Sequence, residues 1–148
     1  MKDTATRILN NFINSDSIKL EFNNCDQYII TSEYAMQVVL QNLMSNSQKF
    51  NDKNTCIISI SLNTEHNRIL IDYKDNGPGI SQKYVNKIFE IFGTLHSKSE
   101  NSTGIGLAIV KTVLHKLSGH IYLVDSKIGN GVHFRIHLPQ QTKKTSAE

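Results

Sequence analysis

Two neighbouring segments of the chain alternate between apolar and polar residues, as strands with one buried face do. These segments are Cys56–Leu62 and Arg68–Asp75, and the polar residues 63–67 between them predict a hairpin. Longer segments with helical spacing of apolar residues predict helices at Glu33–Phe50 and Ile105–Leu117. The pattern therefore mixes hairpin strands with long helices.

Signals at the ends of the segments support these elements. Thr31 or Ser32 offers an N-cap, and Glu33 lies in the first turn, where the helix dipole favours a carboxylate. Gly119 ends the second long helix. The other predicted elements are short helices at Thr4–Asn14 and from Ser81 to about Phe89, and strands at Ile18–Phe22, Tyr28–Ile30, Ile121–Asp125 and Val132–Leu138. Together they predict an α+β fold: a two-layer α/β sandwich with a mixed, mostly antiparallel sheet and its helices on one face.

Composition indicates one domain. The chain has 148 residues, of which 39% are apolar, enough for a single core. We expect residues 1–139 to form this domain and the polar residues 140–148 to be a disordered tail. The net charge of +3 is spread along the sequence, and no apolar run approaches the roughly 20 residues that cross a bilayer. We therefore expect no nucleic-acid partner and no membrane contact by this domain.

Cysteine usage favours the cytoplasm. Cys25 and Cys56 lie far apart, in no spacing typical of zinc ligands or of a disulfide framework. Of the six histidines, none stands on an exposed helix beside an acidic residue, as a phosphate-accepting histidine would. His133 and His137 share one strand face without a third metal ligand, which is typical of surface residues.

Polar residues form a stripe on the helix Glu33–Phe50. Asn42, Asn46 and Lys49 stand at i, i+4 and i+7 and so share one face, with Phe50 at its edge. Two carboxamides and an ammonium on a half-buried face can coordinate a divalent ion and neutralise phosphate oxygens. A solvated helix face is the alternative interpretation.

A tight turn directly follows the strand Arg68–Asp75. Its sequence is Asp75, Asn76, Gly77, Pro78, Gly79 and Ile80. Two glycines around a proline let the backbone approach a flat ligand, and the carboxylate of Asp75 can accept a hydrogen bond from an exocyclic amine. A plain turn is the alternative.

A second glycine-containing segment opens the helix Ile105–Leu117. Thr103, Gly104, Ile105, Gly106 and Leu107 stand where the unpaired amides of a helix N-terminus can bind an anion such as a triphosphate. No GxxxxGK[ST] or GxGxxG spacing occurs, which excludes a P-loop and a dinucleotide fold.

In this combination the chain resembles the histidine-kinase ATPase domain (Bergerat fold) of the superfamily that also contains DNA gyrase B, the MutL repair proteins and a heat-shock chaperone. The resemblance runs from about Ile18 to Pro139. Its motifs are an N box at Asn42–Phe50, a G1 box at Asp75–Ile80, an F box at Ile88–Phe92, a G2 box at Thr103–Lys111 and a closing hairpin at Gly119–Pro139.

The resemblance implies ATP and Mg²⁺ as cofactors. Asn46 would be the Mg²⁺ ligand, Asn42 and Lys49 would contact the phosphates and act in catalysis, and Phe50 would form an apolar wall against the adenine. Asp75 would bind the adenine amino group. The remaining implied nucleotide contacts are Gly77, Gly79 and Ile80 at the base, Thr103, Gly104, Ile105, Gly106 and Leu107 at the phosphates, and Lys98 or His96 in an ATP lid at residues 93–103.

The resemblance also implies a reaction and partners. Hydrolytic members have a carboxylate four residues before the metal-binding Asn, where this chain has Asn42, which cannot act as a base. This favours phosphoryl transfer to a histidine on a separate dimerisation hairpin, and then to a response-regulator receiver. Phe89 and Phe92 would anchor the lid and face that hairpin, although Phe89 could equally be a core aromatic residue.

Two alternative functions remain, and the sequence differs from the family pattern at two positions. The chain could be a nucleotide-gated interaction module or pseudokinase, or a protein-serine kinase of the anti-sigma type. The family usually has a Gly where Ser102 stands, and a Thr in the closing strand where Val132 stands. Because Val132 removes a hydroxyl expected near the adenine, we expect looser base binding.

Overall fold

The computed structural model describes residues 15–26, 29, 31–90 and 104–140, and every structural statement below refers to these residues. The predicted helix Thr4–Asn14, the predicted lid and residues 141–148 of the predicted tail 140–148 lie outside them, as do two of the three residues of the predicted strand Tyr28–Ile30. Gln140, the first residue of that tail, is described, and its amide donates to the Asn67 carbonyl at 2.8 Å. Within the described part of the chain, no helix is long and apolar enough to cross a membrane.

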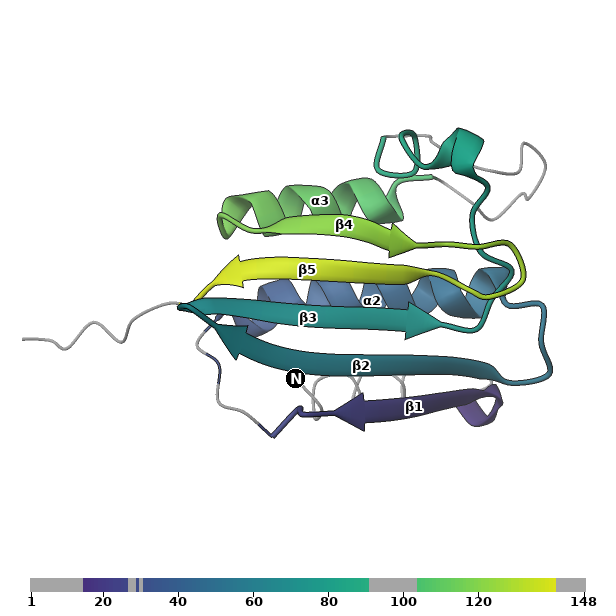
Figure 1. Cartoon of the computed structure of the whole chain (residues 1–148), viewed down its shortest axis with the longest axis horizontal. Coiled ribbons are helices and arrows are strands. Elements are labelled where there is room, and N and C mark those ends of the chain that lie inside the picture. The colour runs from purple at the N-terminus through teal and green to yellow at the C-terminus, as the bar shows by residue number, and fades with distance from the viewer. Residues whose placement is uncertain (1–14, 27–28, 30, 91–103, 141–148) are drawn as a thin grey trace, which may run out of the picture.

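Five strands form one mixed sheet in the order β1-β2-β3-β5-β4 (Figure 1). Their bounds are β1 Ile18–Asn23, β2 Cys56–Glu65, β3 Arg68–Asp75, β4 His120–Asp125 and β5 His133–Pro139. Only the β1–β2 pairing is parallel, while β2–β3, β3–β5 and β4–β5 are antiparallel. The predicted mixed, mostly antiparallel sheet is confirmed.

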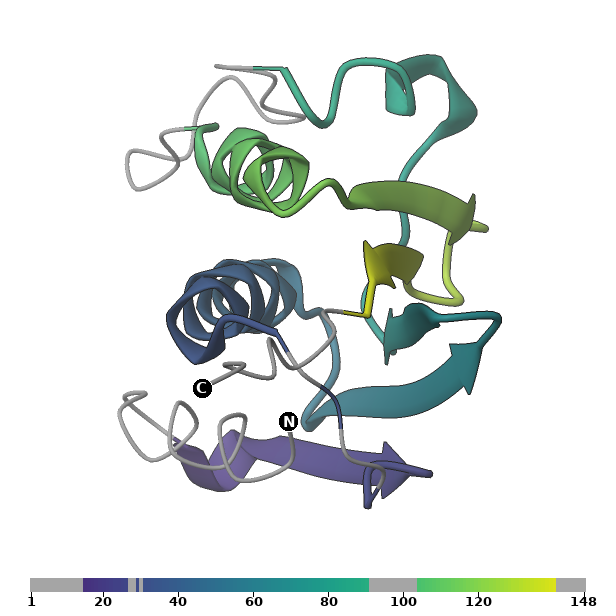
Figure 2. The same ribbon diagram turned by 90° about the vertical axis from the view of Figure 1, so that its left-hand side faces the viewer.

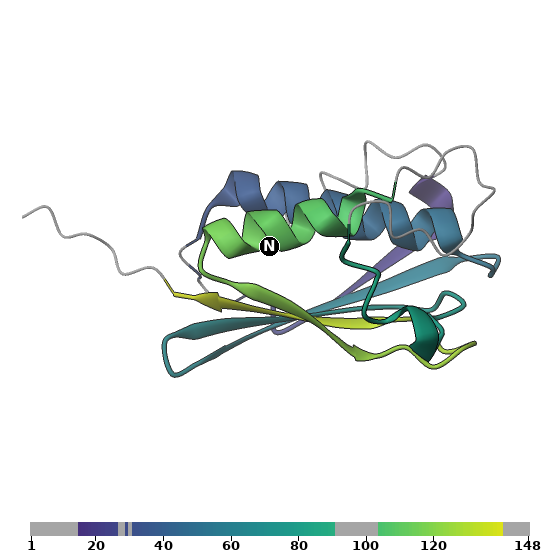
Figure 3. The same ribbon diagram turned by 90° about the horizontal axis from the view of Figure 1, so that it is seen from above.

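Two long helices cover one face of this sheet. They are α2 (Glu33–Phe50) and α3 (Gly106–Lys116), and they lie side by side over the strands (Figures 2 and 3). Ser32 is the N-cap of α2, and its hydroxyl accepts a hydrogen bond of 3.2 Å from the Ala35 amide. The second layer is thus helical, and the predicted two-layer sandwich is confirmed.

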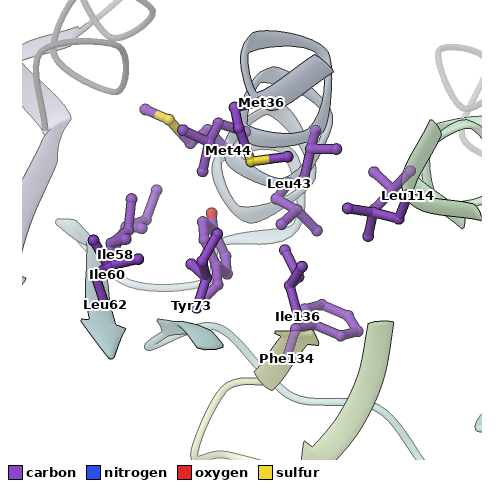
Figure 4. Close-up of a cluster of buried hydrophobic side chains, with 14 of the residues drawn as sticks. Met36, Leu43, Met44, Ile58, Ile60, Leu62, Tyr73, Leu114, Phe134 and Ile136 are labelled. Carbon is purple, nitrogen blue, oxygen red and sulfur yellow. The ribbon is translucent and has the colours of Figure 1, made fainter. Parts of the chain in front are cut away.

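The core lies between α2 and the inward face of the sheet (Figure 4). Because strand side chains alternate between faces, every second residue of β2 and β3 points inward. The fully buried residues include Leu43 and Met44 of α2, Ile58, Ile60 and Leu62 of β2, Ile71 and Tyr73 of β3, Leu114 of α3 and Ile136 of β5. Tyr73 is the one member of this group with a hydroxyl, which points towards α2 (Figure 4).

The opposite face of the sheet has a polar cluster. Asp72 of β3 pairs in register with Arg135 of β5, and its Oδ1 accepts a hydrogen bond of 2.8 Å from the Arg135 Nε. His133 Nε2 lies 2.5 Å from the same oxygen. This cluster therefore lies on the side of the sheet away from the helices.

Several bounds differ from the predictions: α3 is one residue shorter at each end, and the bounds of β1, β4 and β5 differ by one residue. The helix predicted from Ser81 to about Phe89 is wrong: a 3-10 turn, η2, spans only Gln82–Tyr84, and single turns follow it. The amides of Tyr84, Val85, Lys87 and Glu90 bind carbonyls three residues back instead of four, and Ser81 makes no side-chain cap bond. The β2–β3 hairpin is also tighter than predicted, because β2 continues to Glu65 and only His66 and Asn67, both at positive φ, form its turn. A second 3-10 turn, η1, spans Ser15–Ser17 before β1.

Candidate functional site

The polar stripe of α2 faces the start of α3. A Cβ atom added to Gly106 would lie 3.1 Å from Asn42 Oδ1 and 3.6 Å from Asn46 Oδ1. The Asn42 amide nitrogen donates a 2.8 Å hydrogen bond to the Val38 carbonyl of its own helix. This bond holds the Asn42 oxygen towards Gly106, so the N-box and G2-box residues lie together.

The Asn46 carboxamide has no hydrogen-bond partner among the described residues. It is half-buried, one helical turn beyond Asn42. An amide oxygen is a hard donor of the kind that Mg²⁺ accepts. Asn46 can therefore offer this oxygen to an ion held mainly by phosphates.

Lys49 and Phe50 lie at the C-terminal end of the same helix. The Lys49 ammonium lies 5.5 Å from the centre of the Phe50 ring, close enough for a cation–π contact. Phe50 remains 37% exposed, which is a large fraction for an aromatic side chain. The two residues thus leave a basic and an apolar surface at this end of α2.

Asp75 at the end of β3 is held by three donors. Its Oδ1 accepts hydrogen bonds from the backbone amides of Gly77, at 3.1 Å, and Val132, at 3.0 Å. Its Oδ2 accepts a hydrogen bond of 2.6 Å from the Ser47 hydroxyl of α2. Since Asn46 and Ser47 are consecutive, one turn of α2 contacts both the G2-box glycine and the G1-box carboxylate.

The sequence interpretation missed Ser47 and Tyr73. The Ser47 hydroxyl lies 2.8 Å from the Tyr73 hydroxyl, and both side chains are buried. Two signals were present in the sequence: a serine on the core-facing side of α2, next to Asn46, and a tyrosine among the inward-facing apolar residues of β3. Buried hydroxyls require partners, and these two residues satisfy each other.

Backbone contacts fix the turn after Asp75. Gly79 has a φ of +78°, and a Cβ there would lie 2.5 Å from the Lys127 carbonyl, so the turn packs directly on the β4–β5 loop. The Ile80 amide donates to the Ser126 carbonyl, and the Ser126 hydroxyl donates to the Ile80 carbonyl. The Gly129 amide binds the Pro78 carbonyl at 2.7 Å.

Asn76 joins the same turn to β2. Its Oδ1 accepts a hydrogen bond of 2.8 Å from the Ile57 amide, and its Nδ2 donates one of 3.0 Å to the Thr55 carbonyl. The side chain thus continues the pairing of β2 beyond the end of β3. Asp75 is thereby held between β2 and the closing hairpin.

The α3 N-terminus has no side-chain cap. Ile105 occupies the cap position without a capping hydrogen bond, and Gly104 before it has a φ of +64°. The first amides of a helix have no partner within it, so those of Gly106 and Leu107 can bind an anion. Thr103, Lys98, His96 and Phe92 lie outside the described residues. Phe89 packs edge-on against Phe134, with ring centroids 6.0 Å apart.

The predicted segments therefore meet at one place in the fold: the Asn42–Asn46 stripe, the strand-end carboxylate of Asp75 and the start of α3. No group of three or more metal-ligating His, Cys, Asp or Glu residues occurs in the part of the chain that the structure describes.

Comparisons with known proteins agree with this arrangement. Residues 31–142 match the family described as histidine kinase-, DNA gyrase B- and HSP90-like ATPases. Cyanobacterial phytochrome A from Nostoc sp. is 32% identical over 112 residues, which are 75% of this chain and 14% of that protein. The sensor protein kinase GraS from Staphylococcus aureus is 31% identical over 120 residues, 80% of this chain and 34% of that protein. The chain thus spans a minor part of these relatives.

Solved structures show the same fold. The mycobacterial sensor histidine kinase MprB superimposes with a TM-score of 0.77 at 23% identity, covering 95% of this chain and 96% of that one. The catalytic domain of the histidine kinase ThkA superimposes with a TM-score of 0.75 at 21% identity, covering 95% and 92%. On the match of residues 31–142, the chain belongs to the family of histidine kinase-, DNA gyrase B- and HSP90-like ATPases, as an ATP-binding catalytic domain of the histidine-kinase type.

Proposed function

We propose that this chain binds Mg²⁺·ATP and transfers the γ-phosphoryl group to a histidine on a separate dimerisation hairpin, in the cytoplasm, as the catalytic part of a two-component sensor kinase. The observation that carries the proposal is the double contact of α2, with Asn42 and Asn46 against Gly106 and Ser47 on Asp75. These contacts support the proposal because the carboxylate that would bind the base and the helix start that would bind phosphate both contact one turn of α2.

Asp75 would recognise the base. Its carboxylate is fixed by the Gly77 and Val132 amides and the Ser47 hydroxyl, yet two oxygens can accept about four hydrogen bonds. The acceptor position left over suits the exocyclic amine of adenine. Gly77, Gly79 and Ile80 would line the base, and Phe50 would cover it from the exposed side.

Asn42, Asn46, Lys49 and the amides of Gly104, Gly106 and Leu107 would hold the triphosphate. Thr103, Ile105 and Lys98 would complete its contacts. Mg²⁺ would be held by Asn46 and phosphate oxygens, and it would supply positive charge against the negative charge that develops during transfer. Lys49 would add a second positive charge at the same end of α2.

The proposed reaction forms one bond to the γ-phosphorus and breaks another. A ring nitrogen of the acceptor histidine forms a bond to the γ-phosphorus, the bond from that phosphorus to the β–γ bridging oxygen breaks, and ADP leaves. The imidazole proton passes to solvent. Residue 42 is an amide and cannot take a proton from water, so transfer to a protein nucleophile is favoured over hydrolysis.

Nucleotide binding can be tested directly. Titration of the chain with a fluorescent ATP analogue and Mg²⁺ should give a Kd that Asp75→Asn weakens by about ten- to a hundredfold, because the carboxylate is lost as an acceptor. Asn46→Asp should also weaken binding, since it adds negative charge where phosphates lie. Asp72→Asn, on the same strand but the opposite face of the sheet, is the matched control. If neither Asp75→Asn nor Asn46→Asp weakens binding, the residue assignments are wrong.

Transfer needs its own assay. The chain is incubated with radiolabelled ATP and the histidine-bearing hairpin of a sensor histidine kinase, and the product is treated with acid and with base. A phosphohistidine is labile in acid, whereas a phosphoserine is labile in base. An acid-labile product supports the kinase proposal; label on serine of a partner points to an anti-sigma type kinase. ATP binding without transfer to any supplied hairpin favours an interaction module or pseudokinase.

A further inference from the structure

Two buried hydroxyls form a chain that ends on Asp75. Tyr73 Oη lies 2.8 Å from Ser47 Oγ, and Ser47 Oγ lies 2.6 Å from Asp75 Oδ2. Tyr73 is fully buried, and Ser47 is 5% exposed. Figure 4 shows the Tyr73 hydroxyl pointing from the sheet towards α2, where Ser47 lies.

The direction of this chain follows from counting protons. A serine hydroxyl has one hydrogen, and Ser47 gives it to Asp75. The Tyr73 hydroxyl must therefore donate to Ser47. Burial raises the pKa of Tyr73 well above its usual range, which keeps the phenol protonated and able to donate. Both hydrogens point towards the carboxylate.

These hydrogen bonds fix the orientation of the Asp75 carboxylate towards a ligand. The Gly77 and Val132 amides donate to Oδ1 and Ser47 donates to Oδ2, so the carboxylate cannot rotate without breaking a bond. A carboxylate held in this way only accepts hydrogen bonds. An amino group at position 6 of a purine would satisfy it, whereas a carbonyl oxygen at the same position would oppose it, acceptor to acceptor.

We propose that Ser47 and Tyr73 are specificity-determining positioning residues: by fixing Asp75 as an acceptor, they select 6-amino purines over 6-oxo purines. The proposal rests on the nucleotide site described under the proposed function. It also changes the expectation drawn from Val132, because a hydroxyl reaches the carboxylate from α2 where the resemblance led us to expect one from the closing strand.

The test compares ATP with inosine triphosphate, which has a carbonyl oxygen in place of the 6-amino group and a hydrogen on the neighbouring ring nitrogen N1. The Kd of each Mg²⁺ complex is measured for wild type, Ser47→Ala, Tyr73→Phe and the double variant. Wild type should prefer ATP, so the Kd for inosine triphosphate divided by the Kd for ATP should be well above one. Ser47→Ala should lower this ratio about tenfold. Tyr73→Phe leaves the Ser47–Asp75 bond in place and should lower the ratio less.

The double variant keeps the test decisive if Ser47→Ala folds poorly. Ser47→Ala alone leaves the buried Tyr73 hydroxyl without a partner, whereas the double variant leaves no unpaired hydroxyl and removes only the donor to Asp75 Oδ2. Ser47→Thr retains the hydroxyl and should retain the ratio. If Ser47 and Tyr73 had a purely structural role, their loss would weaken the binding of both nucleotides alike and leave the ratio of the Kd values unchanged.

The outcomes separate this inference from the proposed function. If wild type binds ATP and Asp75→Asn weakens that binding, but Ser47→Ala and the double variant keep the wild-type ratio, the inference is overturned and the nucleotide site stands. If wild type binds neither nucleotide, both fall. A ratio that drops with loss of the Ser47 hydroxyl and returns in Ser47→Thr supports the inference.

Discussion

Gly131 lies directly against the main-chain carbonyl of Asp75: a Cβ atom at residue 131 would overlap that oxygen. The contact joins the closing hairpin to the end of β3. It is reinforced on both sides, because the Asp75 amide donates to the Val132 carbonyl at 3.1 Å and the Val132 amide donates to the Asp75 carboxylate. Glycine is required here by space as well as by its φ of +77°.

This contact predicts a difference between two glycines. Gly129 has a similar φ of +89°, but a Cβ there would have no neighbour within 4 Å. Gly129→Ala should therefore lose only the roughly 1–2 kcal/mol that a left-handed conformation costs an alanine. Gly131→Ala should lose about 1–3 kcal/mol more, because the backbone must shift. Urea unfolding of both variants measures the difference, and equal losses would contradict the close approach.

Gly106 gives a prediction about binding. Gly106→Ala should weaken Mg²⁺·ATP binding roughly tenfold, about 1.4 kcal/mol, because the new methyl group would displace the Asn42 carboxamide. Its melting temperature should not fall, since alanine favours a helix over glycine. Ile109→Ala, on the same helix and exposed, serves as the control for nucleotide affinity. Unchanged affinity in Gly106→Ala would place the phosphates elsewhere.

Asn76 gives a prediction about stability. Asn76→Ala should lower the free energy of unfolding by about 1–3 kcal/mol, because it leaves the Ile57 amide and the Thr55 carbonyl without their partner. Asn63→Ala is the matched change on β2, where the side chain is exposed and binds the neighbouring Thr64 amide. That variant should stay within about 0.5 kcal/mol of wild type. A similar small effect for both would mean that Asn76 is not needed to hold the turn.

The Asp72 cluster gives a prediction about pH. Burial would raise the pKa of Asp72, but hydrogen bonds from Arg135 and His133 outweigh it, so the pKa lies below its ordinary value of 3.8. A pKa lowered by folding means that the carboxylate stabilises the fold above about pH 3.8, and that this contribution is lost as the pH falls through the folded-state value. Asp72→Asn should therefore be less stable than wild type by about 1–3 kcal/mol near neutral pH.

The stability difference between wild type and Asp72→Asn should shrink as the pH falls from about 3.8 through the folded-state pKa of Asp72. Urea unfolding of wild type and Asp72→Asn at about pH 7 and about pH 3 measures it. Glu21→Gln, which removes an exposed ion pair with Lys19, should change stability by less than about 1 kcal/mol at either pH. A difference for Asp72→Asn that does not depend on pH would mean that the carboxylate charge is not what stabilises this face.

Much of the fold could be predicted because local and long-range signals agree. Helix α2 begins and ends at the predicted residues, since Ser32 caps it and its apolar stripe faces the sheet along its length. Strand β3 also has its predicted bounds. The segment after Ser81 differs because Tyr84, Ile88 and Phe89 can pack against the core from single turns as well as from a helix, and the apolar pattern does not distinguish the two.

The candidate site could be predicted in outline but not in its connections. Asp75, Asn46 and Gly106 are visible as motifs in the sequence, whereas the bond between Ser47 and Asp75 joins residues on different elements. Its only sequence sign is a polar residue at a position that otherwise faces the core. Similarly, the sequence around Asn76 indicates only an ordinary turn residue. Its hydrogen bonds to Ile57 and Thr55 depend on strand pairing that the turn sequence does not specify.

The bonds between the turn 77–80 and the loop 126–131 have a consequence for local opening. Gly129 and Ile80 donate backbone hydrogen bonds across the two segments, and Ser126 adds a side-chain bond. Because neither segment can separate without releasing the other, their amide protons should exchange with solvent together, as one cooperative unit. A purine seated on the turn would then slow hydrogen exchange in a loop that lies about fifty residues further along the chain.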